Sequence, residues 1–154
     1  MPAAEIEITE DLVRRLLDEQ HPDLAGLSIE PLANGWDNVI FRLGEEYTVR
    51  VPRRQVAAVL VENEQKWLGV LAQRLPIRIP VPARVGNPSE QFPWHWSVCP
   101  WFGGQMAADT TLTDPFADAI RLGEFLGALH RPAPEDAPEN PWRGQPIAES
   151  SRIK

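Results

Sequence analysis

YTVRVPRRQVAAVLVENEQKWLGVLAQRL, residues 47–75, joins a predicted strand directly to the longest predicted helix of the chain. Its first five residues alternate in character, which predicts a strand with one buried face and with Arg50 on the other face. From Gln55 onward apolar residues recur at steps of three and four, the spacing of an amphipathic helix. This apolar stripe consists of Leu60, Trp67, Leu68, Leu71 and Leu75.

Glu64 lies in the middle of this apolar stripe, because each residue advances a helix by about 100°. A carboxylate among apolar side chains is costly unless a cation pairs with it. Arg50, on the preceding strand, is the nearest candidate cation by topology. Paired in this way, the two residues would form the arrangement with which protein kinases hold nucleotide phosphates. The alternative is that Glu64 tilts to the edge of the stripe and is merely solvated, and the spacing favours neither interpretation.

The rest of the chain supplies further elements around this central segment. A helix is predicted over Ile8–Leu17, with Thr9 as its N-cap. Strands are predicted at 27–32, 39–43, 47–51, 77–81 and 94–98, and a last helix over 115–130 follows the capping pair Asp114-Pro115. Short connections between the first three strands favour antiparallel pairing. We therefore predict an α+β fold, with a five-stranded antiparallel sheet and the long helix inserted after its third strand.

Two loops of the predicted sheet contain residues that suit nucleotide binding. Residues 34–38, Asn-Gly-Trp-Asp-Asn, connect two strands and could fold over phosphates with their backbone N–H groups. The same residues also suit an ordinary hairpin. Residues 97–104 run from a strand into Gly103-Gly104. This second loop is either a hinge whose backbone recognises the edge of a base or simply the end of a strand.

The composition is that of a soluble globular protein. Of 154 residues, 43% are hydrophobic and 24% are charged. The net charge of −7 is a poor match to a phosphate backbone, so we expect no nucleic-acid partner. No apolar stretch approaches the ~20 residues that span a bilayer, and the acidic N-terminus lacks the features of a signal peptide. With a single cysteine, Cys99, these features predict a cytoplasmic protein without membrane contact.

The sequence resembles the aminoglycoside phosphotransferase family in five segments and in their order along the chain. These segments are NGWDNVIFRLG, YTVRVPRR, VENEQKWLGVLAQRLPIRIPVPARVG, SVCPWFGG and LGEFLGALHR. Its members are small-molecule kinases with a protein-kinase-like fold. Within the family, the sequence of these segments is most similar to the branch that includes macrolide phosphotransferases. The resemblance covers roughly Ile29 to Arg131. It implies a kinase-like N-terminal lobe (N-lobe) at 1–104, a linker and first helix of a C-terminal lobe (C-lobe) at 105–131, and a truncated Pro-rich tail at 132–154.

The resemblance also implies roles for single residues. Arg50 falls where the family places a strand lysine or arginine on the nucleotide phosphates, and Glu64 is similar to its partner on the helix. Arginine in place of lysine replaces a point charge by a planar fork, which should keep the attraction to phosphate and change its geometry. The implied nucleotide-binding residues are Gly35, Trp36, Asp37 and Asn38 in a phosphate-covering loop, Arg50 and Glu64, and Cys99, Pro100 and Trp101 in a hinge that holds the purine.

The catalytic half of the family pattern is missing from this sequence. Its histidines are His21, His95 and His130, and none is followed by the Gly-Asp of the family's catalytic loop. Neither the catalytic base nor the magnesium-binding aspartate of phosphoryl transfer is present, so no catalytic or metal-binding residue is assigned. We expect weak binding of ATP or GTP, binding of Mg²⁺ only when the missing C-lobe is supplied, and a small-molecule acceptor only in a full-length enzyme.

The helix predicted at 115–130 is apolar nearly all round, and no second layer is predicted to cover it. We expect the chain to form a homodimer through this helix, to aggregate, or to leave the helix detached from the N-lobe and mobile. Gly123 and Gly127 would let another backbone approach closely, which favours the homodimer. Two functions follow from the sequence. In the first, which the resemblance implies, the chain is the nucleotide-binding half of an aminoglycoside- or macrolide-type antibiotic phosphotransferase that uses ATP or GTP. This half is expected not to be catalytic alone. The alternative is a non-enzymatic protein-interaction module that uses the 115–130 helix.

Overall fold

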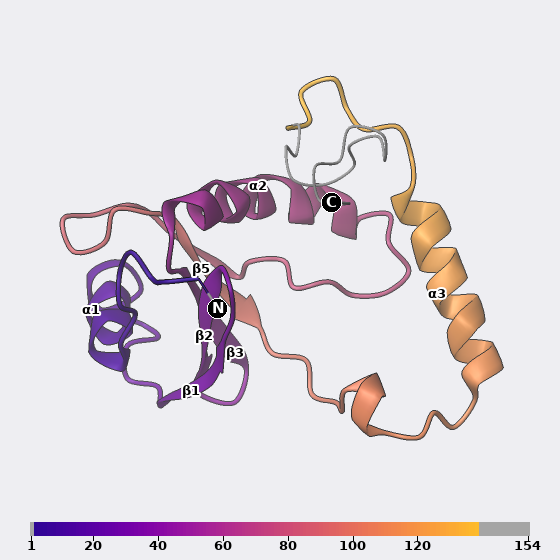
Figure 1. Ribbon diagram of the computed structural model, residues 1–154, viewed down its shortest axis with the longest axis horizontal. Helices are drawn as coiled ribbons and strands as arrows, with labels where there is room; N and C mark the ends of the chain where they lie inside the picture. The colour runs from indigo at the N-terminus through magenta and orange to yellow at the C-terminus, as the bar shows by residue number, and fades with distance from the viewer. Residues whose placement is uncertain (1, 139–154) are drawn as a thin grey trace.

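The computed structural model describes residues 2–138, which form a small lobe, an extended linker and a helix that stands apart from the lobe (Figure 1). The elements in chain order are α1 (Glu10–Gln20), β1 (Ile29–Asn34), β2 (Asn38–Leu43), β3 (Tyr47–Pro52), α2 (Gln55–Ala72), β4 (Arg84–Gly86), β5 (Trp96–Pro100), the short 3₁₀ helix η1 (Ala107–Asp109) and α3 (Pro115–Leu129). No helix within these residues has the length and apolar character needed to cross a bilayer. The predicted α+β class is confirmed.

The strands of the sheet lie in the order β1-β2-β3-β5-β4, and every neighbouring pair is antiparallel. β2 and β3 are joined by a tight turn in which Gly44 has a φ of +55°, a left-handed conformation that glycine adopts without strain. α2 follows β3, and the chain returns to the far side of β3 as β5, which makes β3 the central strand. The predicted five-stranded antiparallel sheet with a long helix after its third strand is confirmed.

The hydrophobic core lies between α1 and one face of the sheet. Val49 and Val51 of β3 and Val98 of β5 are fully buried in it. α1 contributes four residues whose helical spacing places them on one side: Leu12, Val13, Leu16 and Leu17. Thr9 caps this helix as predicted, because its Oγ1 accepts from the N–H of Leu12 at 3.2 Å. The opposite face of the sheet is left to α2.

The side chains that α2 buries lie in the first half of its length. Its buried residues are Ala57, Ala58 and Val61, whereas the apolar stripe predicted from the sequence is only half-buried. The residues that α2 buries are therefore not those of the stripe. Beyond Gln65 the helix extends past the strands, and a Cβ placed on Gly69 would have the loop residue Val81 as its nearest neighbour (Figure 1).

Prolines set the end of α2 and exclude the strand predicted at 77–81. α2 ends at Ala72, three residues before its predicted end, because Pro76 disfavours helical geometry in the residue before it. Residues 77–81 form no strand, since the flanking prolines have no N–H to donate and the N–H of Val81 bonds locally to the carbonyl of Ile79 at 2.8 Å. The fourth strand is β4 instead.

Gly86 of β4 has the least room for a side chain. A Cβ placed there would lie 1.9 Å from Cε2 of the fully buried Trp96, whereas nothing lies within 4 Å of a Cβ placed on Gly26. We expect Gly86→Ala to lower the free energy of unfolding by on the order of 3 kcal/mol, because β4 must move away from β5 to relieve the overlap. Gly26→Ala should leave it nearly unchanged. Urea unfolding followed by circular dichroism compares them, and equal stabilities would contradict this packing.

Candidate nucleotide-binding site

Arg50 and Glu64 form an ion pair on the face of the sheet that α1 does not cover. Arg50 Nη1 lies 2.8 Å from Glu64 Oε2, and each side chain keeps 31% of its surface exposed. β3 presents Arg50 to this face because its neighbours Val49 and Val51 face the core. α2 presents Glu64 beside it because Glu64 follows the buried Val61 by about one helical turn. The predicted pairing is confirmed, and the alternative of a merely solvated Glu64 is wrong.

A third polar residue, Asn38, completes the surroundings of the pair. Its amide oxygen, turned toward Arg50, accepts from Nη2 at 3.1 Å and from Nε at 3.3 Å, and the Asn38 side chain is buried. Burial raises the pKa of the Glu64 carboxyl, and the charge and hydrogen bond of Arg50 only partly oppose this rise. Because desolvation outweighs the attraction, the ion pair fixes geometry more than it stabilises the fold.

Gln65, which sequence reasoning missed, fixes α2 to the sheet beside the ion pair. Its Nε2 donates to the carbonyl of Trp96 at 2.8 Å and to Oγ of Ser97 at 3.0 Å. Ser97 is the β5 residue opposite Arg50 in the β3–β5 ladder. The sequence gives no signal for this contact, because one of its partners is a backbone carbonyl that any residue could provide.

The predicted phosphate-covering loop, residues 34–38, is a tight hairpin between β1 and β2. The N–H of Gly35 donates to the carbonyl of Asn38 at 2.9 Å, so this donor is used within the loop. Trp36, in the middle of the loop, has 70% of its surface exposed. The hairpin interpretation of this segment is therefore confirmed, while its contact with phosphates stays a prediction.

Two consecutive arginines after β3 fasten this loop, and sequence reasoning missed both. Arg53 Nη1 donates to Oδ1 of Asn34 at 2.8 Å and to the carbonyl of Gly35 at 3.2 Å. Arg54 Nη2 lies 2.7 Å from Oδ1 of Asp37. The sequence does contain a signal for these contacts. Two arginines follow the predicted third strand, and its antiparallel neighbour, the second strand, begins at the loop 34–38. Through these contacts the loop is fixed next to the end of β3.

The predicted hinge, residues 99–101, continues β5 beyond its pairing with β4, which ends at Val98. The N–H of Trp101 donates to the carbonyl of Glu46 at 2.7 Å, so it is engaged inside the sheet. Because backbone groups alternate in direction along an antiparallel strand, the carbonyl of Pro100 points away from β3. Proline fits this position because it has no N–H to leave unpaired on that side.

Cys99, the first residue of the hinge, is close enough to the ion pair for both charges to affect its thiol. Burial raises the pKa of its thiol to about 11, while Arg50 lowers this pKa and Glu64 raises it by smaller amounts. Both charges therefore act on the thiol. A buried thiol with so high a pKa stays protonated at neutral pH and is not a nucleophile.

One face of the sheet thus brings together Asn38 of β2, Arg50 of β3, Glu64 of α2 and Cys99 of β5. The register places the loop 34–38 at the end of β3 that contains Pro52 and the hinge at the end that contains Tyr47. An elongated anion could lie along this face, with a phosphate at the arginine fork and a flat group toward the hinge.

The described residues contain no cluster of metal-binding side chains. Within residues 2–138 no group of three metal-ligating side chains lies together. The carboxylate of the loop, Asp37, is paired with Arg54 at 2.7 Å. We therefore derive no catalytic step that involves a metal.

The sequence profile of the phosphotransferase enzyme family APH matches residues 28–153. The match covers most of the chain, so the chain belongs to this phosphotransferase family. The predicted family resemblance is confirmed. No curated protein sequence matches the chain.

Solved aminoglycoside phosphotransferases have a similar fold over part of their length. The GDP complex of wild-type aminoglycoside 2'-phosphotransferase-IIIa is 22% identical with a TM-score of 0.70, over 79% of this chain and 42% of its own. The streptomycin–ATP complex of APH(2″)-IIa is 18% identical with a TM-score of 0.60, over 84% of this chain and 42% of its own. ADP-bound APH(2″)-Ib is also 18% identical, with a TM-score of 0.61, over 83% of this chain and 42% of its own. The chain spans about two fifths of the length of these proteins.

Glu64→Gln should change the pH dependence of stability in a definite direction. Because burial raises the pKa of Glu64, the folded chain binds a proton there more tightly than the unfolded chain does. The stability gained from this proton is complete below the ordinary pKa and is lost as the pH rises through the raised pKa. The free energy of unfolding of the parent minus that of Glu64→Gln should therefore be larger at about pH 4 than at about pH 7.

Urea unfolding at the two pH values measures this difference, and Glu62→Gln is the matched control. Glu62 is exposed on the same helix, two residues earlier. For each variant, the free energy of unfolding is subtracted from that of the parent at both pH values. If this difference changes with pH by the same amount for Glu62→Gln as for Glu64→Gln, a specific effect of the buried carboxyl is contradicted.

Proposed function

We propose that the chain is the nucleotide-binding lobe of a small-molecule kinase that uses ATP or GTP to phosphorylate a hydroxyl of an antibiotic. The observation that carries this proposal is the Arg50–Glu64 ion pair on a polar sheet face, with a loop at one end and a hinge at the other. A chain that served only as an interaction module would not require this pair. Structures of similar fold that contain GDP, ADP or ATP support the proposal.

In this proposal, Arg50 binds the nucleotide phosphates, and Glu64 and Asn38 hold its guanidinium in place. The carbonyl of Pro100 accepts from a purine amino group, which adenine carries at C6 and guanine at C2, so the two bases would meet the hinge through different edges. Affinity is weak because this lobe supplies one side of a cleft. The remaining proposed contacts come from the loop and the hinge: Gly35, Trp36, Asp37, Cys99 and Trp101.

The proposed acceptor is an aminoglycoside or a macrolide, and the proposed role is resistance to such an antibiotic in the cytoplasm. Structures of similar fold include complexes with kanamycin and with streptomycin, which supports the aminoglycoside class. The same proposal divides the chain into an N-lobe at 1–104, a linker and first C-lobe helix at 105–131, and a tail at 132–154. Of that tail, residues 139–154 lie outside the described residues.

We also propose that this chain alone transfers no phosphoryl group. The sequence contains no His-Gly-Asp segment, and within residues 2–138 no three His, Cys, Asp or Glu side chains lie together. Positioned metal ions and an oriented carboxylate supply most of the acceleration in phosphoryl transfer.

Nucleotide binding by the 154-residue chain is the first test, with fluorescent analogues of ATP and GTP as probes. The parent should bind both, and Arg50→Ala should raise the Kd at least about tenfold because it removes charge-assisted hydrogen bonds to phosphate. Arg84→Ala is the matched control. It removes an exposed arginine of β4 that lies 3.4 Å from Asp23, and it should bind like the parent.

Equal affinities of the parent and Arg50→Ala, or equal losses in both variants, would contradict the role of Arg50. The same preparations, incubated with ATP or GTP, Mg²⁺ and either antibiotic class, should yield no phosphorylated product. Product from the parent that is absent with Arg50→Ala would contradict the proposal that the chain is inactive alone.

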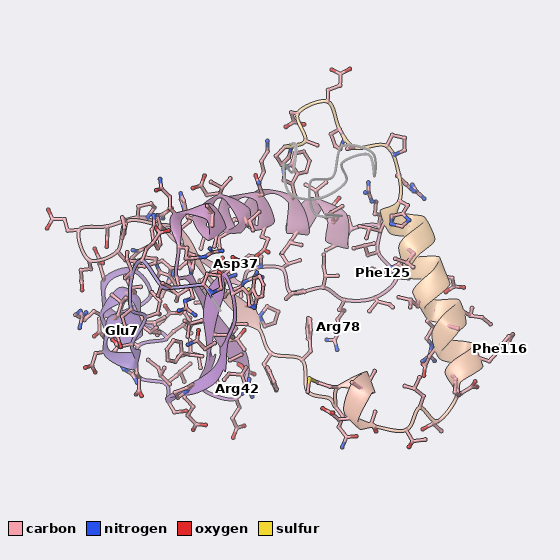
Figure 2. The ribbon with its side chains drawn as sticks, viewed as in Figure 1. Glu7, Asp37, Arg42, Arg78, Phe116 and Phe125 are labelled. Carbon is pink, nitrogen blue, oxygen red and sulfur yellow. The ribbon has the colours of Figure 1, made fainter. Side chains whose placement is uncertain are left out.

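α3 favours the second function, a protein-interaction module. None of its residues is buried, although many are apolar. Phe116 is 77% exposed and points away from the lobe, whereas Phe125 lies on the inner side of the helix (Figure 2). At 100° per residue, the outer face consists of Phe116, Ile120, Gly123 and Gly127. No atom lies within 4 Å of a Cβ placed on either glycine. We propose that this outer face packs against the same face of a second copy.

Ile120→Glu should shift the chain from dimer to monomer, because it places a charge at the centre of the proposed helix–helix contact. Arg121→Glu changes the charge of the neighbouring residue, which is directed away from this face, and should leave the dimer intact. Sedimentation velocity at several protein concentrations measures the distribution. A parent chain that is monomeric at the highest concentration would contradict the dimer.

A further inference from the structure

Arg42 of β2 joins three segments at the hinge end of the sheet (Figure 2). Its Nη1 donates to the carbonyl of Tyr47 at 3.2 Å, and its Nη2 donates to the carbonyl of Glu45. The same guanidinium stacks on Trp101, with 4.4 Å between Cζ and the ring centroid. One side chain of β2 therefore contacts both the β2–β3 turn and the hinge.

The backbone of Trp101 is held by the same turn. Its N–H donates to the carbonyl of Glu46 at 2.7 Å. The carbonyls of three successive residues, 45–47, are thus all engaged, the outer two by Arg42 and the middle one by Trp101. We call this unit, formed by Arg42, residues 45–47 and Trp101, the hinge latch.

The latch holds the chain where β5 ends, and the next residue contacts the loop 77–81, since Arg78 Cζ lies 5.2 Å from the ring centroid of Phe102. β5 has no β4 partner after Val98, and Pro100 has no N–H to donate. In the described part of the chain, residues 101–106 belong to no strand, and they include Gly103 and Gly104. Cys99 and Pro100 pair with Thr48 and Tyr47 of β3. The contacts that Trp101 makes with the turn and with Arg42 extend this hold by one residue toward the linker.

We propose that Arg42 is a positioning residue of the purine site, which keeps the backbone of Pro100 and Trp101 where a purine contacts it. This inference rests on the proposed nucleotide-binding function. Arginine suits the role because a planar guanidinium can donate to two carbonyls and stack on an aromatic ring at once. The compact ammonium of lysine cannot make all three contacts from one position.

Two readouts on the 154-residue chain test the latch, amide hydrogen exchange followed by NMR and competition binding with ATP, GTP and inorganic tripolyphosphate. In Arg42→Lys, the Trp101 amide should exchange at least about tenfold faster, while the amide of Val49 in the sheet core exchanges as in the parent. Affinity for ATP and GTP should fall about tenfold, and affinity for tripolyphosphate should not change, because the phosphate end of the site is untouched. In Trp101→Leu, which removes the stacking partner, the backbone amide at position 101 should also exchange at least about tenfold faster. Arg84→Lys is the control.

Unchanged exchange of the Trp101 amide in Arg42→Lys would overturn the latch. Equal losses of affinity for tripolyphosphate and for the nucleotides would overturn its action through the purine end, as would faster exchange with unchanged nucleotide affinity. If the parent bound neither ATP nor GTP, the proposed function and the purine role would both fail. Faster Trp101 exchange in Arg42→Lys would then still show the latch as a structural contact, so the two failures are distinguishable.

Discussion

The ion pair between Arg50 and Glu64 is the contact on which the arrangement of the polar face depends. The helix α2 buries only small side chains against the strands, Ala57, Ala58 and Val61, and such residues allow close approach without fixing the rotation of a helix. Directional contacts on the next turn supply that information, since Glu64 meets a strand cation and Gln65 meets the backbone of β5. The desolvation that raises the pKa of Glu64 indicates that this orientation is maintained at some cost in stability.

The parts of this arrangement that could be predicted from sequence are those that depend on local period. Alternation around Arg50 identified its face of β3, and the position of Glu64 in a helical stripe identified the need for a partner. The stripe did not identify which residues of α2 are buried, because a helical period shows which residues share a side and not how far the helix overlaps the sheet. The strand predicted at 77–81 failed because alternation of side chains takes no account of missing N–H donors.

Contacts between side chains and backbone escaped prediction for a different reason. Gln65, Arg53 and Arg42 all bind carbonyl groups, and every residue has a carbonyl, so the sequence does not mark the partner. At the hinge this matters for the site itself. The pattern around Cys99–Trp101 identified a segment, but only the structure shows that the N–H of Trp101 is already engaged with Glu46. The order of motifs along the chain was more informative than any one of them, and it identified the family.

The choice of arginine at position 50 follows from how its donors are shared. A guanidinium has five N–H donors, and here one nitrogen binds Glu64 while Nη2 and Nε bind the amide oxygen of Asn38. Three of the five donors are thereby used to hold the fork, and the other two are not used by these contacts. A lysine ammonium has three donors, so the same two anchors would leave it one donor where arginine keeps two. Arginine therefore lets one residue be positioned from two sides, by β2 and by α2, and still present a bidentate edge to an anion.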